Sequence, residues 1–211
     1  MSTFGKLTDG ASSSSNAAAM QGSKFTMPED GLVSKLTVRN WVEGAAKNAK
    51  GVVYDDDGGS GDPGTRKGIS VEVNVSSNSE GAVDYSFSPA LSLTSGNWWL
   101  FVFHDGAVSP NQFMTSRDNN AGQRLGKNVT YASGPPDPAG GSFSSLAGPL
   151  DIYATYQPTF FASGVLTPTG AGTFARVIKS ALAGALTSAG AIATQINRVV
   201  SIAGAFSPAK N

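Results

Sequence analysis

Ionisable side chains that could bind a metal gather in one glycine-rich segment of this sequence. The run Asp55-Asp56-Asp57, followed by Asp62, supplies the clustered oxygens that Ca²⁺ prefers. The run lacks the spacing and the closing glutamate of an EF-hand loop, and three consecutive Asp side chains cannot all face one ion. Two interpretations stay open: a calcium site at Asp55, Asp57 and Asp62, or a hairpin loop whose Asp side chains bond their own backbone. We favour the second and expect no metal or cofactor.

His104 is the only histidine, and so the one side chain that suits general-base catalysis near neutral pH. A general base needs a nucleophile within hydrogen-bond reach and an acid that orients it. Asp105 is adjacent in the sequence and is not placed opposite His104 for that role. We therefore expect His104 to lie at the rim of a sheet, with no catalytic residues and no enzymatic activity.

Three tryptophans could form a platform for stacking sugars, because aromatic faces suit the apolar faces of sugar rings. Trp98 and Trp99 are neighbours, and neighbours in a strand point to opposite faces, so at least one of them belongs to the core. Trp41 and Trp99 remain the candidate contacts to a glycan or a partner. Lys35 and Arg39 share the outer face of a predicted strand, which we interpret as a solvated face and not a phosphate site.

The strand that must position these residues is predicted at 97–104, after a turn at 94–96. Seven successive residues from Trp98 to His104 are aromatic, β-branched or leucine, the types that favour a pleated and packed surface. Both faces of this strand are apolar. It is therefore either central and covered on both sides, or in contact with a partner chain.

Shorter alternating segments surround this strand and predict an antiparallel jelly-roll β-sandwich over 24–157. The cleanest alternation places Ile69, Val71, Val73 and Val75 in the core. Residues 1–23 include a low-complexity run of Ala and Ser, which predicts an extended N-terminal arm. The other predicted strands are 24–27, 32–39, 50–54, 69–75, 83–87, 111–117, 126–131 and 150–156.

The composition is that of an extracellular or virion protein. Only 14% of the residues are charged, 26 are glycine, none is cysteine, and the net charge is zero. Zero net charge argues against nucleic acid as a partner, and the absence of cysteine excludes disulfides and thiolate metal sites. Neither a signal peptide nor a membrane span is predicted. A virion protein made in the host cytoplasm combines these properties.

Two segments carry a resemblance to known proteins: G-V-V-Y-D-D-D-G-G-S-G-D-P-G-T at 51–65 and F-S-P-A-L-S-L-T-S-G-N-W-W-L at 87–100. They resemble jelly-roll modules of bacterial surface proteins and of tailed-phage structural proteins. The opening F-G-K-L-T-D-G-A-S-S-S-S at 4–15 resembles the phage members. The resemblance spans about residues 1–157 and implies a jelly-roll fold; it transfers no catalytic residue.

The C-terminal segment contains an internal repeat and no Asp or Glu after Asp151. The repeat units are spaced by twenty residues and align Leu166, Leu186 and Phe206. Each of these residues lies two positions after a glycine, and it is followed by Thr or Ser and then by Pro or Ser. The repeat resembles Ala/Gly/Leu-Thr-Pro repeats of phage proteins. A helix at 174–186, short strands joined by turns, and a flexible tail are the alternatives. We favour strands, because each glycine weakens a helix by about 1 kcal/mol relative to alanine.

These features predict a structural protein of a tailed-phage virion, either a capsid decoration (cement) protein or a short head or tail fibre. Residues 158–211 would be the assembly tail of a homotrimer, with Leu166, Leu186 and Phe206 as its contact positions. Other virion proteins, such as the major capsid protein, would be further partners. The alternative is a carbohydrate-binding adhesion module that recognises a host surface glycan.

Overall fold

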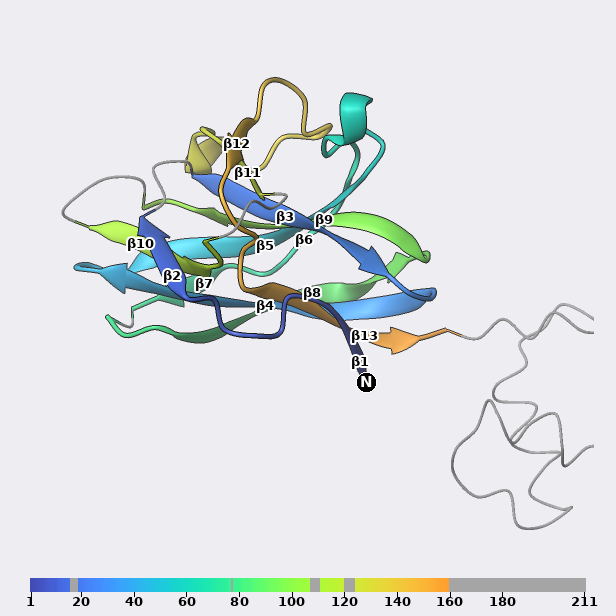
Figure 1. Cartoon of the computed structure of the whole chain (residues 1–211), viewed down its shortest axis with the longest axis horizontal. Coiled ribbons are helices and arrows are strands. Elements are labelled where there is room, and N and C mark those ends of the chain that lie inside the picture. Colours follow the sequence, from blue (N-terminus) through green and yellow to red (C-terminus); the bar gives the residue numbers. More distant parts are fainter. Residues whose placement is uncertain (16–18, 77, 107–110, 120–123, 160–211) are drawn as a thin grey trace, which may run out of the picture. The chain divides into compact units, whose positions relative to one another are not determined.

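The computed structural model describes residues 1–15, 19–76, 78–106, 111–119 and 124–159. Two antiparallel sheets face each other in this part of the chain (Figure 1), and the predicted all-β sandwich is confirmed. Two single 3₁₀ turns, η1 (Gly59–Gly61) and η2 (Tyr131–Ser133), are its helical elements, so within these ranges no helix is long enough to cross a membrane. Contacts divide the chain into Met1–Thr159 and Phe160–Asn211. The predictions for the repeat lie outside the described residues.

The first sheet is organised around the long strand β4. Strand β8 pairs with one edge of β4, and β13 and β10 lie end to end along the other edge, where β13 pairs with residues 31–38 and β10 with residues 40–43. Asn40 shows that the edges differ, because it pairs with Gly81 of β8 on one side and with Thr115 of β10 on the other. Strand β1 pairs with the outer edge of β13, and β2 with that of β10. The bounds are β1 (Ser2–Gly5), β2 (Ser12–Ser15), β4 (Gly31–Glu43), β8 (Gly81–Leu93), β10 (Gln112–Arg117) and β13 (Ile152–Pro158).

The second sheet is organised around β9, the strand with two apolar faces. Strand β9 pairs with β3 on one edge and with β5 on the other. Strand β11 extends the sheet beyond β3 and is followed by β12, while β6 and β7 both pair with the free edge of β5. The bounds are β3 (Met20–Met27), β5 (Lys47–Asp55), β6 (Arg66–Ile69), β7 (Val73–Val75), β9 (Gly96–His104), β11 (Arg124–Lys127) and β12 (Ser144–Leu146).

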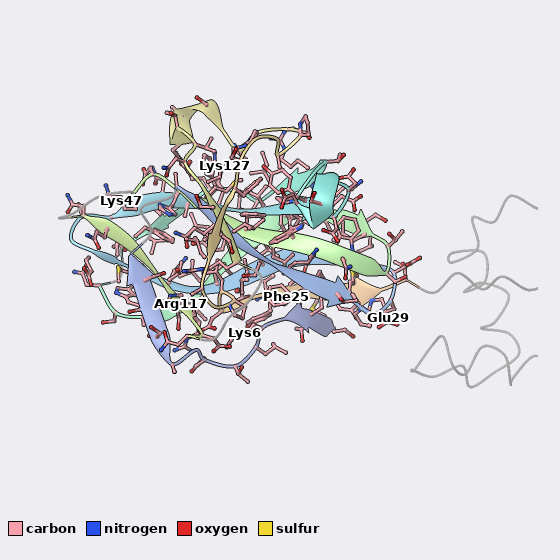
Figure 2. All side chains as sticks on the ribbon, turned by 45° about the horizontal axis from the view of Figure 1, so that its top comes forward. Lys6, Phe25, Glu29, Lys47, Arg117 and Lys127 are labelled. Atoms are coloured by element: carbon pink, nitrogen blue, oxygen red, sulfur yellow. The ribbon has the colours of Figure 1, made fainter. Side chains whose placement is uncertain are left out.

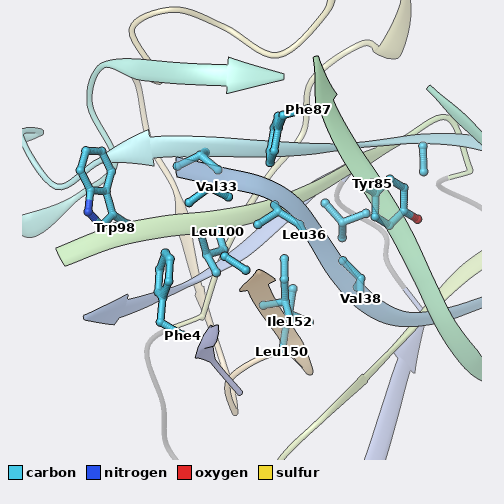
Figure 3. Packing of buried hydrophobic residues seen from close by; sticks show 14 of the residues in the cluster. Phe4, Val33, Leu36, Val38, Tyr85, Phe87, Trp98, Leu100, Leu150 and Ile152 are labelled. Carbon is cyan, nitrogen blue, oxygen red and sulfur yellow. The ribbon is translucent and has the colours of Figure 1, made fainter. Parts of the chain in front are cut away.

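Both faces of β9 are buried by the chain itself. Trp98, Leu100 and Val102 belong to the inner cluster, which lies between the sheets; Figure 3 shows Leu100 packed with Leu36 of β4. Trp99, Phe101 and Phe103 belong to an outer cluster, covered by the segment 129–143. That segment is anchored by the Tyr54 hydroxyl, which donates to the carbonyl oxygen of Pro136 over 2.7 Å. Of the two alternatives predicted for this strand, the structure shows the central strand with both faces covered.

The predicted core register around residues 69–75 is wrong. Ile69 is 37% exposed and Val71 is 52% exposed, whereas Val75 is 3% exposed and Val73 packs partly against the inner cluster. Between β6 and β7 the chain turns inward at Ser70, whose hydroxyl accepts a hydrogen bond from the Gly51 N–H over 2.8 Å. The Val71 N–H then donates to the Ser86 carbonyl of the other sheet. This kink interrupts the alternation that the sequence suggests.

The N-terminal segment differs from the extended arm expected over residues 1–23. Strands β1 and β2 are edge strands of the first sheet, and β3 begins already at Met20. Phe4 is 4% exposed, and its ring packs edge-on against Tyr156 with a centroid distance of 5.9 Å. Serine-rich β2 has no apolar period, so its pairing with β10 depends on backbone hydrogen bonds that local sequence does not reveal.

Candidate functional site

The acidic loop between β5 and β6 distributes its carboxylates over separate partners. Asp55 pairs with the Lys67 ammonium over 3.0 Å, and Asp56 with the Lys24 ammonium over 3.1 Å. Asp57 accepts from the hydroxyl and the backbone N–H of Thr65, both over 2.6 Å, and these bonds lower its pKa. Asp55 and Asp57 accept from backbone N–H groups of the loop, as the second interpretation expects, whereas Asp56 bonds Lys24 and Trp99 of other strands. Across the described ranges, no group of three or more His, Cys, Asp or Glu side chains converges as a metal site would require.

A shallow cleft lies beside this loop. It has a volume of about 260 Å³ and separates the acidic loop from the segment that covers the outer cluster. The two walls are joined at the base, where the Ala139 N–H donates to the Gly64 carbonyl over 2.8 Å. The opening is lined by peptide groups, by the carboxylates of Asp57 and Asp62 and by the aromatic ring of Phe143. This combination suits a small polar ligand such as a sugar. Its lining includes Asp57, Asp62, Thr65, Pro138, Gly140 and Phe143.

The tryptophans do not form one platform. Trp98 and Trp99 point to opposite faces of β9, as predicted, and both are buried, with exposed fractions of 4% and 3%. The Trp99 ring is therefore not available for stacking on a glycan. Trp41 is half-buried on β4, in the other sheet, so Trp41 and Trp99 share no surface.

His104 is fully buried, which corrects the expected position at the rim of a sheet. Its ring stacks on Phe113 with a centroid distance of 4.3 Å and an interplanar angle of 7°. Its Nδ1 accepts a hydrogen bond from the Gly106 N–H over 3.2 Å. Asp105 is exposed, and its carboxylate accepts from the Asn48 N–H over 2.9 Å. The described contacts of His104 are thus those of a packed side chain.

Ion pairs on the outer face of the first sheet hold the N-terminal segment in place. Lys6 lies 2.9 Å from Asp151 and 3.3 Å from Asp118; burial lowers the pKa of Lys6, but its hydrogen bonds to these carboxylates outweigh burial and raise it. Arg39 lies 2.8 Å from Asp9. These pairs explain why residues before β2 lie against the sheet.

Lys35 and Arg39 point outward from β4, as predicted. Lys35 lies 2.5 Å from Asp84, and Arg39 lies 3.0 Å from Glu80 in addition to its pair with Asp9. Carboxylates of the chain therefore neutralise both cations, which agrees with a structural role for this face.

Arg117 and Arg124 enter the end of the layer between the sheets. Neither residue is a candidate on the basis of the sequence alone. Arg124, at the start of β11, is 5% exposed and donates to the hydroxyl of Ser14 over 2.9 Å. Arg117, at the end of β10, lies near Lys6 at the β2 side of the sandwich (Figure 2). A lone Arg at a strand end is common on protein surfaces, so only the three-dimensional structure reveals that these two are placed inward.

Comparisons of the chain with known protein families, with curated proteins and with solved structures found no match. The candidate assembly positions Leu166, Leu186 and Phe206 belong to the part of the chain that the structure does not describe.

Proposed function

We propose that this chain is a structural protein of a tailed-phage virion, either a capsid decoration (cement) protein or a short head or tail fibre. The observation that supports it is the all-β sandwich, which has two clusters of buried apolar side chains within Met1–Thr159 and agrees with the jelly-roll modules that the sequence resembles. The repeat follows this unit in the sequence.

The repeat is the proposed assembly element. A unit of twenty residues with one apolar position has too little apolar surface to offset its own ordering entropy. Three copies around one axis would bury Leu166, Leu186 and Phe206 against their equivalents. The homotrimer would present three sandwiches to the particle, with the major capsid protein or another virion protein as the attachment partner.

The test is absolute quantitation of the chain in purified particles of the phage whose genome encodes it, together with antibody labelling in electron micrographs. We expect many copies per particle, in multiples of three, at regularly spaced surface positions. Recovery of the chain from the lysate but not from washed particles would contradict the proposal.

A second candidate is a carbohydrate-binding module, favoured by the cleft between the acidic loop and residues 138–143. Carboxylates such as Asp57 and Asp62 bond sugar hydroxyls, and the Phe143 ring offers an apolar face. A glycan array with the full chain distinguishes this role from the first. Binding that Phe143→Ala abolishes, and that Trp41→Ala leaves unchanged, would support the module.

A further inference from the structure

In the part of the chain that the structure describes, two arginines, Arg117 and Arg124, have no acidic partner. All fifteen Asp and Glu residues of the sequence lie within the described ranges. Their ion pairs there involve Lys6, Lys24, Lys35, Arg39, Lys50, Arg66 and Lys67. Arg117 and Arg124 take part in none of these ion pairs. Arg124 is buried, and Arg117 is half-buried with a buried Nε. Because burying charged groups is costly unless they are paired and hydrogen-bonded, these two side chains require an explanation.

Strand pairing places both arginines in the same layer. Arg117 forms a bridge with Leu150, a residue of the inner cluster, and paired residues of neighbouring strands share a face. Arg124 is paired with Ser23, which in turn lies opposite Leu100 of the inner cluster. Both guanidinium groups therefore enter the space between the two sheets, from opposite sides.

Polar side chains of β2 and β3 lie beside the two arginines. Nη1 of Arg124 donates to Ser14 of β2 over 2.9 Å and to Oε1 of Gln21 of β3 over 3.3 Å. Ser12, two residues before Ser14 on the same strand, is paired with Arg117. Residues two apart on a strand face the same side, so Ser14 and Arg117 are diagonal neighbours, about 7–8 Å apart between Cα atoms.

Each of the two arginines has a buried donor without a hydrogen-bond partner among the described residues. The Nε–H groups of Arg117 and Arg124 are both buried and have no hydrogen-bond partner among the described residues. Nη1 of Arg117 is bonded to the Asp118 carbonyl and to Oδ1 of Asn119, both of them uncharged acceptors. Burial and the neighbouring charge of Arg117 lower the pKa of Arg124 to about 10, so Arg124 is still protonated at neutral pH.

The carboxylates that adjoin Arg117 and its bridge partner Leu150 in the sequence both pair with Lys6. Asp118 follows Arg117 directly, but its carboxylate pairs with Lys6 over 3.3 Å. Asp151, 2% exposed, also pairs with Lys6 and accepts from the Gly10 N–H over 2.6 Å. A counterion for the two guanidinium groups must therefore be a group other than these carboxylates.

We propose that Arg117 and Arg124, with Ser14 and Gln21 as positioning residues, bind a small oxyanion of the phosphate or sulfate class. A tetrahedral oxyanion offers several acceptors to donors that converge from two directions, and guanidinium groups bind such anions through paired hydrogen bonds. The ligand must be small, because Arg124 is only 5% exposed and a side chain of a folded partner would reach it only by opening the sandwich. The bound anion would join β2 and β10 of one sheet to β11 of the other.

The test is the thermal unfolding of the full-length chain in potassium phosphate, in potassium sulfate and in potassium chloride of equal ionic strength. Because a ligand that binds only the folded state stabilises it, the midpoint should rise with phosphate or sulfate concentration but not with chloride. Isothermal titration calorimetry with inorganic phosphate should give one site per chain. Phenyl phosphate, a monoester, distinguishes a site for a free anion from one that accepts a phosphate group on a larger molecule.

Three variants locate the site. Arg117→Gln should weaken phosphate binding about tenfold or more, since it removes a charge-assisted hydrogen bond. Arg124→Met should abolish the phosphate-dependent rise, and in chloride it should melt no lower than the wild type, because it replaces a buried charge with an apolar side chain. Arg66→Gln is the matched control, since Arg66 pairs with Asp137 in the outer loop, and its response to phosphate should equal that of the wild type.

Equal midpoints in phosphate, sulfate and chloride for the wild type would overturn the proposal. A rise in Arg117→Gln that equals the rise of the wild type at every phosphate concentration would overturn it as well, because the effect would then be a general one of the salt. Arg117 is partly exposed at a strand end, so this variant is expected to fold even if Arg124→Met does not.

Discussion

The indole N–H of Trp99 donates a hydrogen bond to the carboxylate of Asp56 over 3.0 Å. The same carboxylate oxygen accepts from the Lys24 ammonium, which lies 5.3 Å from the centroid of the Trp99 ring. The acidic loop, the central strand and β3 are therefore joined at one point. Asp56, which lies between the candidate metal residues Asp55 and Asp57, therefore has a structural role.

Asp56→Ala should lower the free energy of unfolding by about 1–3 kcal/mol, because it leaves the buried indole N–H of Trp99 without an acceptor. Asp62→Ala is the control: the Asp62 side chain has no hydrogen bond or ion pair with the described residues, so the change should stay within about 0.5 kcal/mol. Urea unfolding of the full chain measures both. Equal losses of unfolding free energy in the two variants would contradict a stabilising role of the hydrogen bond between Asp56 and Trp99.

The different burial of Val102 and Val71 predicts opposite results for two valine substitutions. Val102→Asp should prevent soluble folding, because Val102 is fully buried in the inner cluster and the new carboxylate would have no partner. Val71→Asp should change stability by no more than about 0.5 kcal/mol, because Val71 is 52% exposed. Soluble expression and circular dichroism melting measure both. An insoluble Val71→Asp protein would instead support the simple alternation of the sequence.

The sequence predicts elements whose determinants are local. Trp98 to Phe103 alternate between two apolar faces, and the structure buries both, so the central strand follows from side-chain type alone. Ile69 and Val71 also alternate, but the Ser70 hydroxyl bonds Gly51 on another strand and turns the chain. No local pattern encodes that contact. The same holds for β2, a serine run that pairs with residues about a hundred positions later.

The candidate site depends even more on long-range contacts. The sequence identified the acidic loop and the tryptophans by residue type, but could not show that Asp56 and Trp99 bond each other. Arg124 reaches Ser14 across 110 positions of sequence, and neither residue belongs to a recognisable motif. Burial of a charge is a property of the assembled sandwich, so the inward placement of Arg117 and Arg124 could be found only in the three-dimensional structure.

Acid should destabilise the sandwich through Asp84. Burial raises the pKa of this carboxyl, but hydrogen bonds from Lys35 and Thr37 outweigh burial and hold the pKa below its ordinary value of 3.8. A folded-state pKa below the unfolded value means that the unfolded chain binds more protons. The contribution of Asp84 is therefore present above pH 3.8 and is lost as the pH falls through the folded-state pKa.

Asp84→Asn should accordingly flatten the fall in stability between about pH 5 and pH 2. The effect should be small, because the Asp84 side chain is 49% exposed and solvent screens its pair with Lys35. Lys35→Met, which removes the first donor, should flatten the same part of the curve. Urea midpoints at half-unit pH intervals provide the measurement, and acid limbs parallel to that of the wild type in both variants would contradict this role of Asp84.

Deleting residues 160–211 should leave a folded sandwich that no longer forms a homotrimer. Met1–Thr159 is a compact unit with two clusters of buried side chains, so the cooperative melting of the sandwich should remain. The deleted segment contains the repeat, whose apolar positions Leu166, Leu186 and Phe206 are the contact positions in the proposed trimer. Light scattering should give a trimer for the full chain and a monomer for the truncated chain.

A triple substitution separates the repeat positions from the length of the segment. Replacing Leu166, Leu186 and Phe206 with serine removes the apolar side chains and keeps the backbone, so it should give the same monomer as the truncation. Replacing Thr167, Thr187 and Ser207 with alanine is the matched control and should keep the trimer, because these neighbours carry no large apolar group. Particle binding of the purified chains should follow the oligomeric state. If the truncated chain keeps the oligomeric state of the full chain and still decorates particles, the repeat is not the assembly element.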